Sequence, residues 1–290
     1  KPSSAASDVY KRQQKNRRKF IKTSAVVASL PLIPHGIWSQ MKNRKLRTVH
    51  IGVGGMGLND LKAISSHKNV LVTALCDVDS DLLNQAHKLF PKAKMFKDYR
   101  ILLNNLENEI DAVVISTPDH THGPASIMAM KKGKAIYCQK PLTNNIIDAR
   151  EMRKISFEKR LVTQMGIQVH SFYDYKLATI LIQGGIIGKV NTVRAWTNSD
   201  HGGYDGPIPK GNDPIPESLD WNLWLGTAKE RPYKEKIYHP GMWRKIVDFG
   251  CGTLGDMGVH IFDTPYNACL LYTSDAADEG LGVDLGGRRI

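Results

Sequence analysis

From residue 47 onward the chain alternates short apolar runs with segments of helical pattern, and this alternation limits the fold more than any other feature. The apolar runs are TVHIGV (48–53), VLVTALC (70–76), AVVIST (112–117) and KAIYC (134–138). The helix-like segments between them are 56–66, 80–89 and 121–132. Strands separated by helices are typical of βαβ units, whose parallel strands form one sheet with helices on both faces. The sequence therefore predicts an α/β fold with a doubly wound parallel sheet.

A glycine-rich turn follows the first predicted strand and opens the first predicted helix. It reads Gly52-Val53-Gly54-Gly55-Met56-Gly57, which contains the pattern G-x-G-x-x-G. In such a turn the first glycine permits a tight bend, the second lets the backbone approach a pyrophosphate, and the last lets the helix pack closely. The helix N-terminus then faces the phosphate charge. Between a strand and a helix this motif predicts a dinucleotide site, with a doubly wound domain that binds no dinucleotide as the alternative.

The second predicted strand ends at an acidic residue, Asp77, twenty residues after Gly57. A carboxylate at this place can accept hydrogen bonds from the ribose diol of NAD. No arginine stands beside Asp77 to neutralise the additional phosphate of NADP. We therefore expect NAD rather than NADP as the cofactor.

Three further motifs occur downstream in a fixed order. They are Thr117-Pro118 with His122, then Gln139-Lys140-Pro141, then Asp256 and His260 within GTLGDMGVHIFD. With the glycine-rich turn, over about residues 46–268, they resemble the glucose–fructose oxidoreductase/inositol dehydrogenase (Gfo/Idh/MocA) family. The resemblance implies an NAD-binding Rossmann domain at 45–168 and an α+β substrate domain with an antiparallel sheet at 169–268. That second domain is expected to be incomplete, because the family has further strands where this chain ends.

The resemblance also suggests roles for individual residues. Lys140 ends a predicted strand, where open parallel sheets bind ligands. Asp256 and His260 are four residues apart, so on a helix they share one face. In the oxidation of a secondary alcohol, His260 would accept the hydroxyl proton, Lys140 would stabilise the developing alkoxide, and Asp256 would orient the substrate or the base. Outside this context such residues are more often solvated surface groups. The residues expected around the cofactor are Gly52, Gly54, Gly55, Met56, Gly57, Asp77, Thr117, His122, Gln139 and Lys140.

One position departs from the family pattern. The family usually has glutamate before the lysine, and this chain has Gln139. Glutamine keeps the ability to form hydrogen bonds but lacks the negative charge that glutamate would place beside Lys140. Three functions therefore stay open. They are an NAD-dependent oxidoreductase of a sugar, polyol or glycoside, a glycosidase that oxidises its substrate transiently with NAD, and a non-catalytic dinucleotide- or sugar-binding relic.

The second half of the chain is less regular. KVNTVRAWTNS (189–199) alternates like a strand of the antiparallel sheet. Aromatic residues follow, and they suit either the wall of a sugar-binding cleft or a compact core. These residues are Tyr204, Trp221, Trp224, Tyr238 and Trp243.

The N-terminal segment 14–40 has the pattern of an export signal. Arg17 and Arg18 precede a short apolar stretch at 24–33, which resembles a twin-arginine signal and implies passage through the twin-arginine machinery to the periplasm. Residues 3–13, SSAASDVYKRQ, resemble a translated sequencing adaptor, and CLLYTSDAADE (269–279) corresponds to its reverse complement. We therefore expect 1–13 and 269–290 to be non-native, and the natural chain to be represented as a fragment.

The composition limits which binding partners are expected. The signal segment carries five of the charges behind the net charge of +12, and the other basic residues are scattered among acids, which argues against nucleic acid as a partner. Neither the histidines nor the cysteines have metal-ligand spacing, so no metal is expected. A small sugar or polyol is the expected substrate. The resemblance implies a homo-oligomer for the full-length protein.

Overall fold

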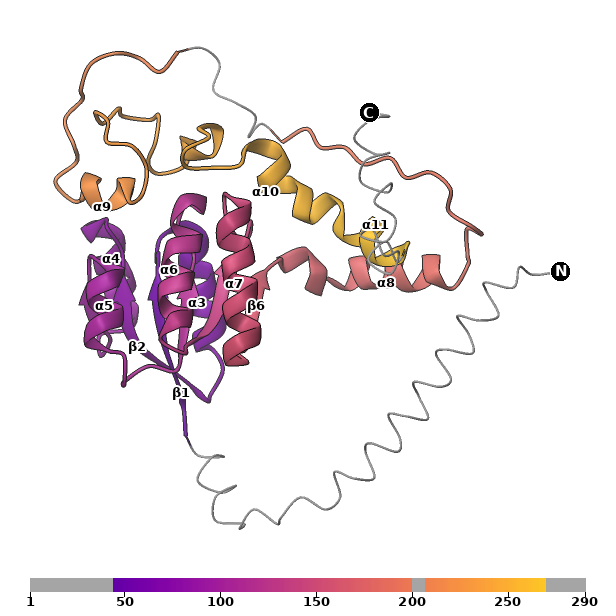
Figure 1. The fold of residues 1–290 in the computed structure, drawn as a ribbon, viewed down its shortest axis with the longest axis horizontal. Coiled ribbons are helices and arrows are strands. Elements are labelled where there is room, and N and C mark those ends of the chain that lie inside the picture. Colours follow the sequence, from indigo (N-terminus) through magenta and orange to yellow (C-terminus); the bar gives the residue numbers. More distant parts are fainter. Residues whose placement is uncertain (1–43, 200–206, 270–290) are drawn as a thin grey trace, which may run out of the picture. The chain divides into compact units, whose positions relative to one another are not determined.

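The structure, a computed structural model, describes residues 44–199 and 207–269. Six parallel strands form one sheet in the order β3-β2-β1-β4-β5-β6 (Figure 1). The strands are β1 (Leu46–Ile51), β2 (Val70–Cys76), β3 (Lys94–Phe96), β4 (Ala112–Ile115), β5 (Ala135–Gln139) and β6 (Thr163–Gly166). The order reverses between β1 and β4, and in open α/β sheets such a reversal leaves a crevice at the carboxyl ends of the strands.

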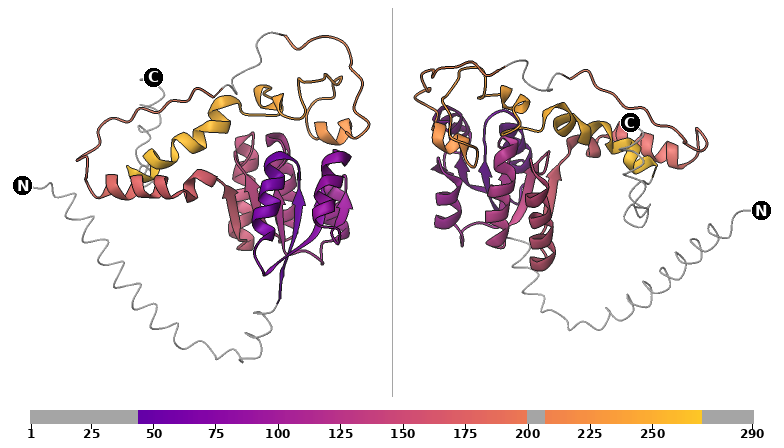
Figure 2. Two further views of the ribbon diagram at one scale, coloured as in Figure 1. Left: turned by 180° about the vertical axis from the view of Figure 1, so that it is seen from behind. Right: turned by 45° about the horizontal axis from the view of Figure 1, so that its top comes forward.

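Helices cover both faces of the sheet, as a parallel sheet requires. They are α3 (Gly55–Ser65), α4 (Ser80–Leu89), α5 (Tyr99–Asn105), α6 (Asp119–Lys131) and α7 (Ile146–Lys159). One core cluster joins the sheet to α5, α6 and α7, with Val49, Val113 and Ala129 fully buried. A second cluster joins it to α3 and α4 around Leu61, Leu75 and Ala86. The left view of Figure 2, turned by 180° from that of Figure 1, shows the sheet from the side of α3 and α4.

Short polar side chains fix where several helices begin. Asp79 caps α4 by accepting from the amide of Asp81, Asp98 caps α5 through the amide of Arg100, and Asn145 caps α7. Each cap satisfies an amide that has no partner inside the helix. The caps follow closely on strand ends, so the loops at the carboxyl ends of the strands are short and well defined.

The prediction of a Rossmann-type parallel sheet is confirmed. All four apolar runs are strands, and the segments predicted as helices correspond to α3, α4 and α6 within two residues. The strands β3 and β6 were not predicted. They are three and four residues long and only partly buried, so neither shows an apolar run.

After β6 the described chain contains helices but no further strand. These are short 3-10 turns at Gln168–Ser171 and Met242–Lys245, with α8 (Tyr173–Gln183), α9 (Trp221–Leu225), α10 (Gly252–Ile261) and α11 (Asp263–Ala268). The strand predicted at 189–199 is wrong in this structure, where these residues have no regular secondary structure. A strand needs a neighbour to pair its backbone, and no described residues offer one.

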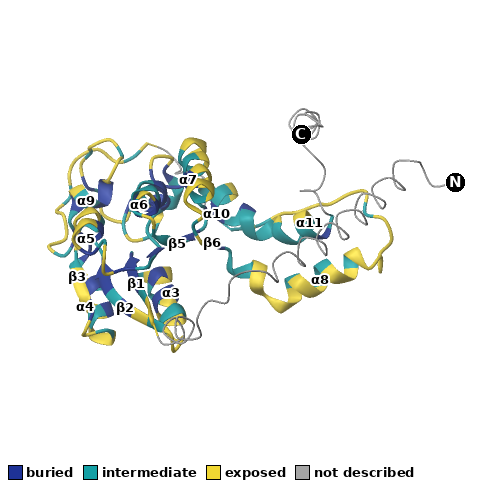
Figure 3. Ribbon diagram, turned by 60° about the horizontal axis from the view of Figure 1, so that its bottom comes forward, coloured by how far each residue is buried: buried dark blue, intermediate teal, exposed yellow. Residues whose placement is uncertain are grey.

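Part of this region exposes apolar surface. Figure 3 shows α8 mostly in the colour of exposed residues, and Tyr173 and Ile180 are 74% and 65% exposed. Tyr204, the signal segment 14–40, residues 1–13 and residues 270–290 lie outside the described residues. Within the described ranges, no helix combines the length and apolar character needed to cross a membrane.

The segment from Leu219 to Phe249 forms a third core, dense in aromatic rings. Its buried members include Trp221, Trp224, Tyr238, Trp243 and Phe249. The segment is fastened to the sheet edge by backbone hydrogen bonds, with the Ser80 amide donating to the Ser218 carbonyl at 2.8 Å and the Asp220 amide donating to the Val78 carbonyl at 2.9 Å. These bonds hold the aromatic core above the carboxyl ends of the strands.

Candidate active site

A cavity of about 370 Å³ lies at the carboxyl ends of the strands. Its floor comes from residues that follow β1, β2, β4 and β5, among them Gly52, Asp77, Thr117 and Lys140. Its other wall comes from the aromatic segment and α10, including Trp224, Trp243, Arg244 and Asp256. The volume is typical of a site for a small molecule.

The glycine-rich turn has the geometry that a dinucleotide requires. Gly52 has a φ of +81°, and a Cβ there would lie 2.6 Å from the carbonyl oxygen of Ser116. A Cβ on Gly57 would lie 2.1 Å from the oxygen of Gly52, so the close packing of α3 against the turn depends on glycine. Gly52, Gly54, Gly55 and Met56 line the cavity, and α3 begins there without a side-chain cap. The turn therefore fits a pyrophosphate.

Asp77 is oriented by the backbone around it. Its Oδ2 accepts from the amide of Val53 at 2.8 Å, and its Oδ1 accepts from the amide of Asp79 at 3.0 Å. Burial raises the pKa of Asp77, and the two hydrogen bonds oppose that rise. Each oxygen retains a lone pair, so the carboxylate can still accept from a ribose diol. This geometry fits the adenosine ribose of NAD.

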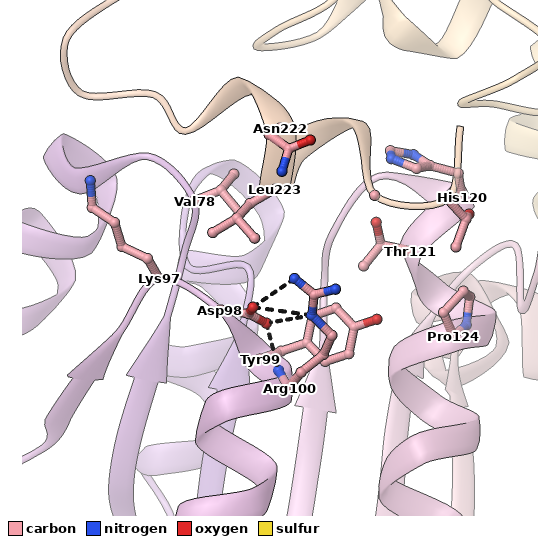
Figure 4. Close-up of a pocket in the computed structure, with 12 residues that line it drawn as sticks. Val78, Lys97, Asp98, Tyr99, Arg100, His120, Thr121, Pro124, Asn222 and Leu223 are labelled. Atoms are coloured by element: carbon pink, nitrogen blue, oxygen red, sulfur yellow. Dashed lines mark hydrogen bonds and ion pairs between the residues drawn. The ribbon is translucent and has the colours of Figure 1, made fainter. Parts of the chain in front are cut away.

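A smaller pocket adjoins the cavity on this side, and the two share Val78, Lys97, Tyr99, Thr121 and Leu223. Figure 4 shows Leu223 and Asn222 from α9 over one side of it, with Asp98 bonded to Arg100 below. The guanidinium Nη2 of Arg100 lies 2.7 Å from Asp98.

That ion pair bears on the choice of cofactor. The arginine lining this pocket already has a carboxylate partner, and Asp77 contributes a second negative charge nearby. An additional phosphate on the adenosine ribose would place negative charge next to the Asp77 carboxylate, which favours NAD over NADP.

Lys140 and Asp256, predicted as catalytic residues, meet in the cavity. Lys140 Nζ lies 2.7 Å from Asp256 Oδ1 and also donates to the backbone oxygen of Asp256 at 3.1 Å. Both side chains are largely buried, with exposed fractions of 15% and 10%. Arg244, not singled out from the sequence, brings its Nε within 3.4 Å of the same carboxylate oxygen. Two cations therefore converge on one buried carboxylate.

His260 lies one turn beyond Asp256 on α10, so the Asp-x-x-x-His pair is on a helix as predicted. Its side chain is not among the residues that line the cavity. Burial, followed by the charge of Lys140, lowers the pKa of His260, and Asp256 opposes this shift. The ring is therefore neutral near pH 7 and able to accept a proton.

Asp119, the first residue of α6, was also missed from the sequence. It is 3% exposed, lines the cavity and accepts from the amide of Cys251 at 3.2 Å. Burial raises the pKa of Asp119 to about 7, and the neighbouring Asp256 charge adds to the rise. Nothing in its sequence context distinguishes it from an ordinary acidic residue at the start of a helix.

His122 supports the site from behind rather than lining it. It is 1% exposed, and its two ring nitrogens lie 2.7 Å from the Pro141 oxygen and 2.8 Å from the Thr117 oxygen. Burial lowers the pKa of His122 to about 4. A neutral ring donates to only one of these carbonyls. Thr117 and Gln139, by contrast, do line the cavity.

The sequence left open whether the aromatic residues form a compact core or the wall of a sugar-binding cleft, and the structure divides them between the two. Trp221 and Tyr238 are buried in the aromatic core and do not line the cavity, whereas Trp224 and Trp243 belong to both. The Arg244 guanidinium lies 4.3 Å from the centre of the Trp243 ring. In the described parts of the chain, no group of three histidine, cysteine or acidic side chains is placed to hold a metal ion.

A doubly wound sheet, a glycine-rich turn and an aspartate after the second strand define a Rossmann domain built for NAD. Comparison with known families agrees. The model of the Gfo/Idh/MocA oxidoreductase family with the NAD-binding Rossmann fold matches residues 46–167, and that of the family's C-terminal alpha/beta domain matches residues 181–276. The chain belongs to this family.

Curated relatives match over part of their length. A glycosyl hydrolase family 109 protein of Stenotrophomonas maltophilia is 30% identical over 194 residues, which are 63% of this chain and 42% of that protein. An inositol 2-dehydrogenase of Rhodococcus jostii is 28% identical over 148 residues, 50% of this chain and 40% of that protein. The chain thus spans less than half the length of these relatives.

Among solved structures, an oxidoreductase domain protein from Kribbella flavida has a TM-score of 0.56 and 23% identity. The match covers 78% of this chain and 54% of that one. At this level of identity the likeness concerns the fold.

Proposed function

We propose that this chain carries the cofactor site and the reacting groups of an NAD-dependent oxidoreductase that acts on a secondary alcohol of a sugar, polyol or glycoside. The observation that carries the proposal is the Lys140–Asp256 pair, which lines the same cavity as the glycine-rich turn and Asp77. A dinucleotide held by the turn would extend through this cavity. The inositol dehydrogenases among the relatives support a polyol as substrate.

Bound NAD supplies the carbon that accepts the hydride. Lys140 donates a hydrogen bond to the substrate hydroxyl oxygen and stabilises the alkoxide that forms there. Asp256 holds the Lys140 ammonium in place through two contacts, one from its side chain and one from its backbone. His260 does not line the cavity, so it would accept the hydroxyl proton only with its ring turned toward the substrate; its lowered pKa keeps the ring neutral for that role.

The two cations at this end of the cavity, Lys140 and Arg244, also favour a polar substrate. Lys140 and Arg244 share one carboxylate, so hydrogen-bond donors remain for substrate oxygens. Trp224 and Trp243 line the cavity and would offer apolar ring surface to the C–H side of a sugar. Ammonium, guanidinium and aromatic groups together suit a polyhydroxylated ring.

A second candidate is a glycosidase that oxidises its substrate transiently and returns the hydride at the end of each cycle. The glycosyl hydrolase family 109 proteins among the relatives favour this alternative. A product assay on the natural full-length protein separates the two. With a panel of polyols and nitrophenyl glycosides, a dehydrogenase forms NADH in proportion to product. The glycosidase releases nitrophenol without net NADH. An oxidoreductase that recycles its cofactor within the site also forms no net NADH, so released nitrophenol is the product that decides for the glycosidase. Neither product, together with no transfer of substrate hydrogen to the bound cofactor, would contradict both proposals.

For location and assembly, we propose export to the periplasm through the twin-arginine machinery and a homo-oligomer of the full-length protein. Support for export comes from Arg17 and Arg18 before an apolar stretch. Replacement of both arginines by lysine should retain the protein in the cytoplasm in a cell-fractionation experiment. Sedimentation of the full-length protein tests the oligomer.

A further inference from the structure

A buried carboxylate lies beneath the cavity floor, on the helix that follows the glycine-rich turn. Asp60 of α3 is 7% exposed, and its Oδ2 accepts from the Ser116 hydroxyl at 2.7 Å and from the Gln139 side-chain amide at 2.8 Å. The three residues come from α3, from the end of β4 and from the end of β5. Asp60 therefore ties three elements together at the carboxyl edge of the sheet.

The cluster connects directly to Lys140. While Gln139 Nε2 donates to Asp60, Gln139 Oε1 accepts from the backbone amide of Lys140 at 3.3 Å. One glutamine side chain thus joins the carboxylate on α3 to the main chain that carries the ammonium. Both ends of the amide are used, so its orientation is fixed by the contacts.

The surroundings leave Gln139 little freedom to turn. Its side chain is buried against Gly166 of β6, where a Cβ would lie 3.0 Å from Gln139 Cδ and 2.8 Å from the hydroxyl of Tyr137. A side chain of this length in so close a space keeps one conformation.

The family usually has glutamate at this position, and the structure gives a reason for glutamine here. A glutamate would place a carboxylate oxygen about 2.8 Å from Asp60 Oδ2, where the amide nitrogen now donates. Two buried carboxylates at that separation cannot both be ionised without strong repulsion. The chain has a single carboxylate in this cluster, on α3 rather than on β5.

We propose that Gln139 is a positioning residue for Lys140. Position 139 requires glutamine because its side-chain amide donates to the Asp60 carboxylate, where a glutamate would repel it. The role of Lys140 rests on the proposed function, whereas the pairing of Asp60 with Gln139 does not. Exchange of the two side-chain types between α3 and β5 should preserve the contact, and a change at one site alone should break it.

The test uses three variants of the natural full-length protein. Gln139→Glu creates the carboxylate pair, Asp60→Asn/Gln139→Glu restores one amide and one carboxylate, and Gln164→Glu makes the same substitution at an exposed position of β6. Melting temperatures are measured at about pH 5 and about pH 8.5. Among the described residues, Tyr137 is a titratable group that faces Asp60; its pKa is raised to about 12, mainly by burial, so it does not titrate in this range.

At about pH 5 the two carboxyl groups of the Gln139→Glu variant can share a proton, which takes the place of the amide hydrogen between them. We therefore expect this variant to melt near the wild-type temperature. At about pH 8.5 its melting temperature should fall by about 5 °C or more. The double variant and Gln164→Glu should follow the wild type at both pH values. A Gln139→Glu variant as stable as wild type at both pH values, or a double variant that shows no rescue, would overturn the pairing.

The effect on Lys140 is read by competitive acetylation and mass spectrometry at about pH 8.5. Lys132, 20% exposed and paired with Glu107, serves as internal reference. In Gln139→Glu the labelling of Lys140 should rise about tenfold relative to Lys132 and return to the wild-type rate in the double variant. Equal labelling in all variants would overturn the positioning role. Absence of turnover in the wild type would count against the proposed function alone, because neither readout depends on activity.

Discussion

The Nζ atom of Lys140 lies 2.7 Å from Oδ1 of Asp256, a contact that joins the end of β5 to helix α10 across 116 residues of sequence. The two side chains come from the regions matched by different models of the family, the Rossmann domain and the C-terminal domain. Both residues line the cavity that also contains the glycine-rich turn. The cavity is thus lined from both regions.

Asp256→Asn should lower kcat about 100-fold and leave the affinity for NAD nearly unchanged. The variant loses the charge that holds Lys140 and Arg244, while the glycine-rich turn and Asp77 are untouched. Steady-state kinetics with a polyol substrate give the measurement. Asp248→Asn, which changes a partly exposed carboxylate paired with Arg231, is the control. An equal loss in both variants would contradict a specific role for Asp256.

Gly57→Ala should weaken NAD binding by about 100-fold or more, because the new Cβ would lie 2.1 Å from the Gly52 oxygen and displace the turn. Gly55→Ala is the matched variant. Gly55 has a φ of +49° with open space around the position of a Cβ, so alanine costs about 1–2 kcal/mol of backbone strain without a collision. Calorimetric titration with NAD measures both variants. Equal affinities would exclude close packing of α3 as the reason for Gly57.

Much of this site follows from local sequence. The four apolar runs, the glycine-rich turn and Asp77 each depend on neighbours within a βαβ unit, so spacing alone places them correctly. The contacts of Asp119, Arg244 and Asp60 could not be predicted in this way. Asp119 meets Cys251 across 132 residues, and Asp60 meets Gln139 across 79. Such contacts are set by how distant segments pack, which has no periodic signal.

The misplaced strand has a related cause. Residues 189–199 alternate in polarity, but alternation records only that one face could be buried. The described chain supplies neither a partner strand nor a cover for that face, and Trp196 is 82% exposed. A pattern of this kind predicts a strand only where the rest of the sheet exists.

Asp119→Asn should change how stability depends on pH. Since burial raises the pKa of Asp119 to about 7, the folded protein holds a proton on this carboxyl that the unfolded chain releases above about pH 4. The wild type therefore loses up to about 1.4 kcal/mol of stability per pH unit between pH 4 and 7, and nothing further above 7.

Asparagine resembles the protonated carboxyl and does not titrate. The two proteins should be equally stable near pH 4, and the variant should be more stable at pH 8 by up to about 4 kcal/mol. Urea unfolding at both pH values gives the difference. Buried histidines such as His122 titrate in both proteins and cancel. A difference that stays constant with pH would contradict an ionisable buried Asp119.

Substitutions of Trp221 and Trp243 test packing and substrate contact separately. Trp221 is stacked on Trp224 at 5.0 Å between ring centres, donates to the Arg231 carbonyl and lies outside the cavity lining. Trp221→Phe should cost about 2 kcal/mol of stability and leave the KM for the sugar unchanged. Trp243→Phe removes ring surface from the cavity wall and should raise that KM several-fold. Thermal melting and kinetics on both variants test this division, and a KM that changes equally in both would contradict it.

The central claim is that this chain transfers a hydride between NAD and a secondary alcohol at the Lys140–Asp256 end of the cavity. The most direct test incubates the natural full-length protein with NAD and a panel of sugars and polyols deuterated on carbon, then examines the cofactor by mass spectrometry. Transfer adds one deuterium to the nicotinamide while the cofactor is reduced. A cofactor released as NADH keeps this deuterium, whereas one recycled within the site gives it back, so the reaction is quenched before the cycle is complete. The account predicts that wild type labels the cofactor and that Lys140→Met labels it at least about 100-fold more slowly. Cofactor that is bound but stays unlabelled with every member of the panel would contradict it.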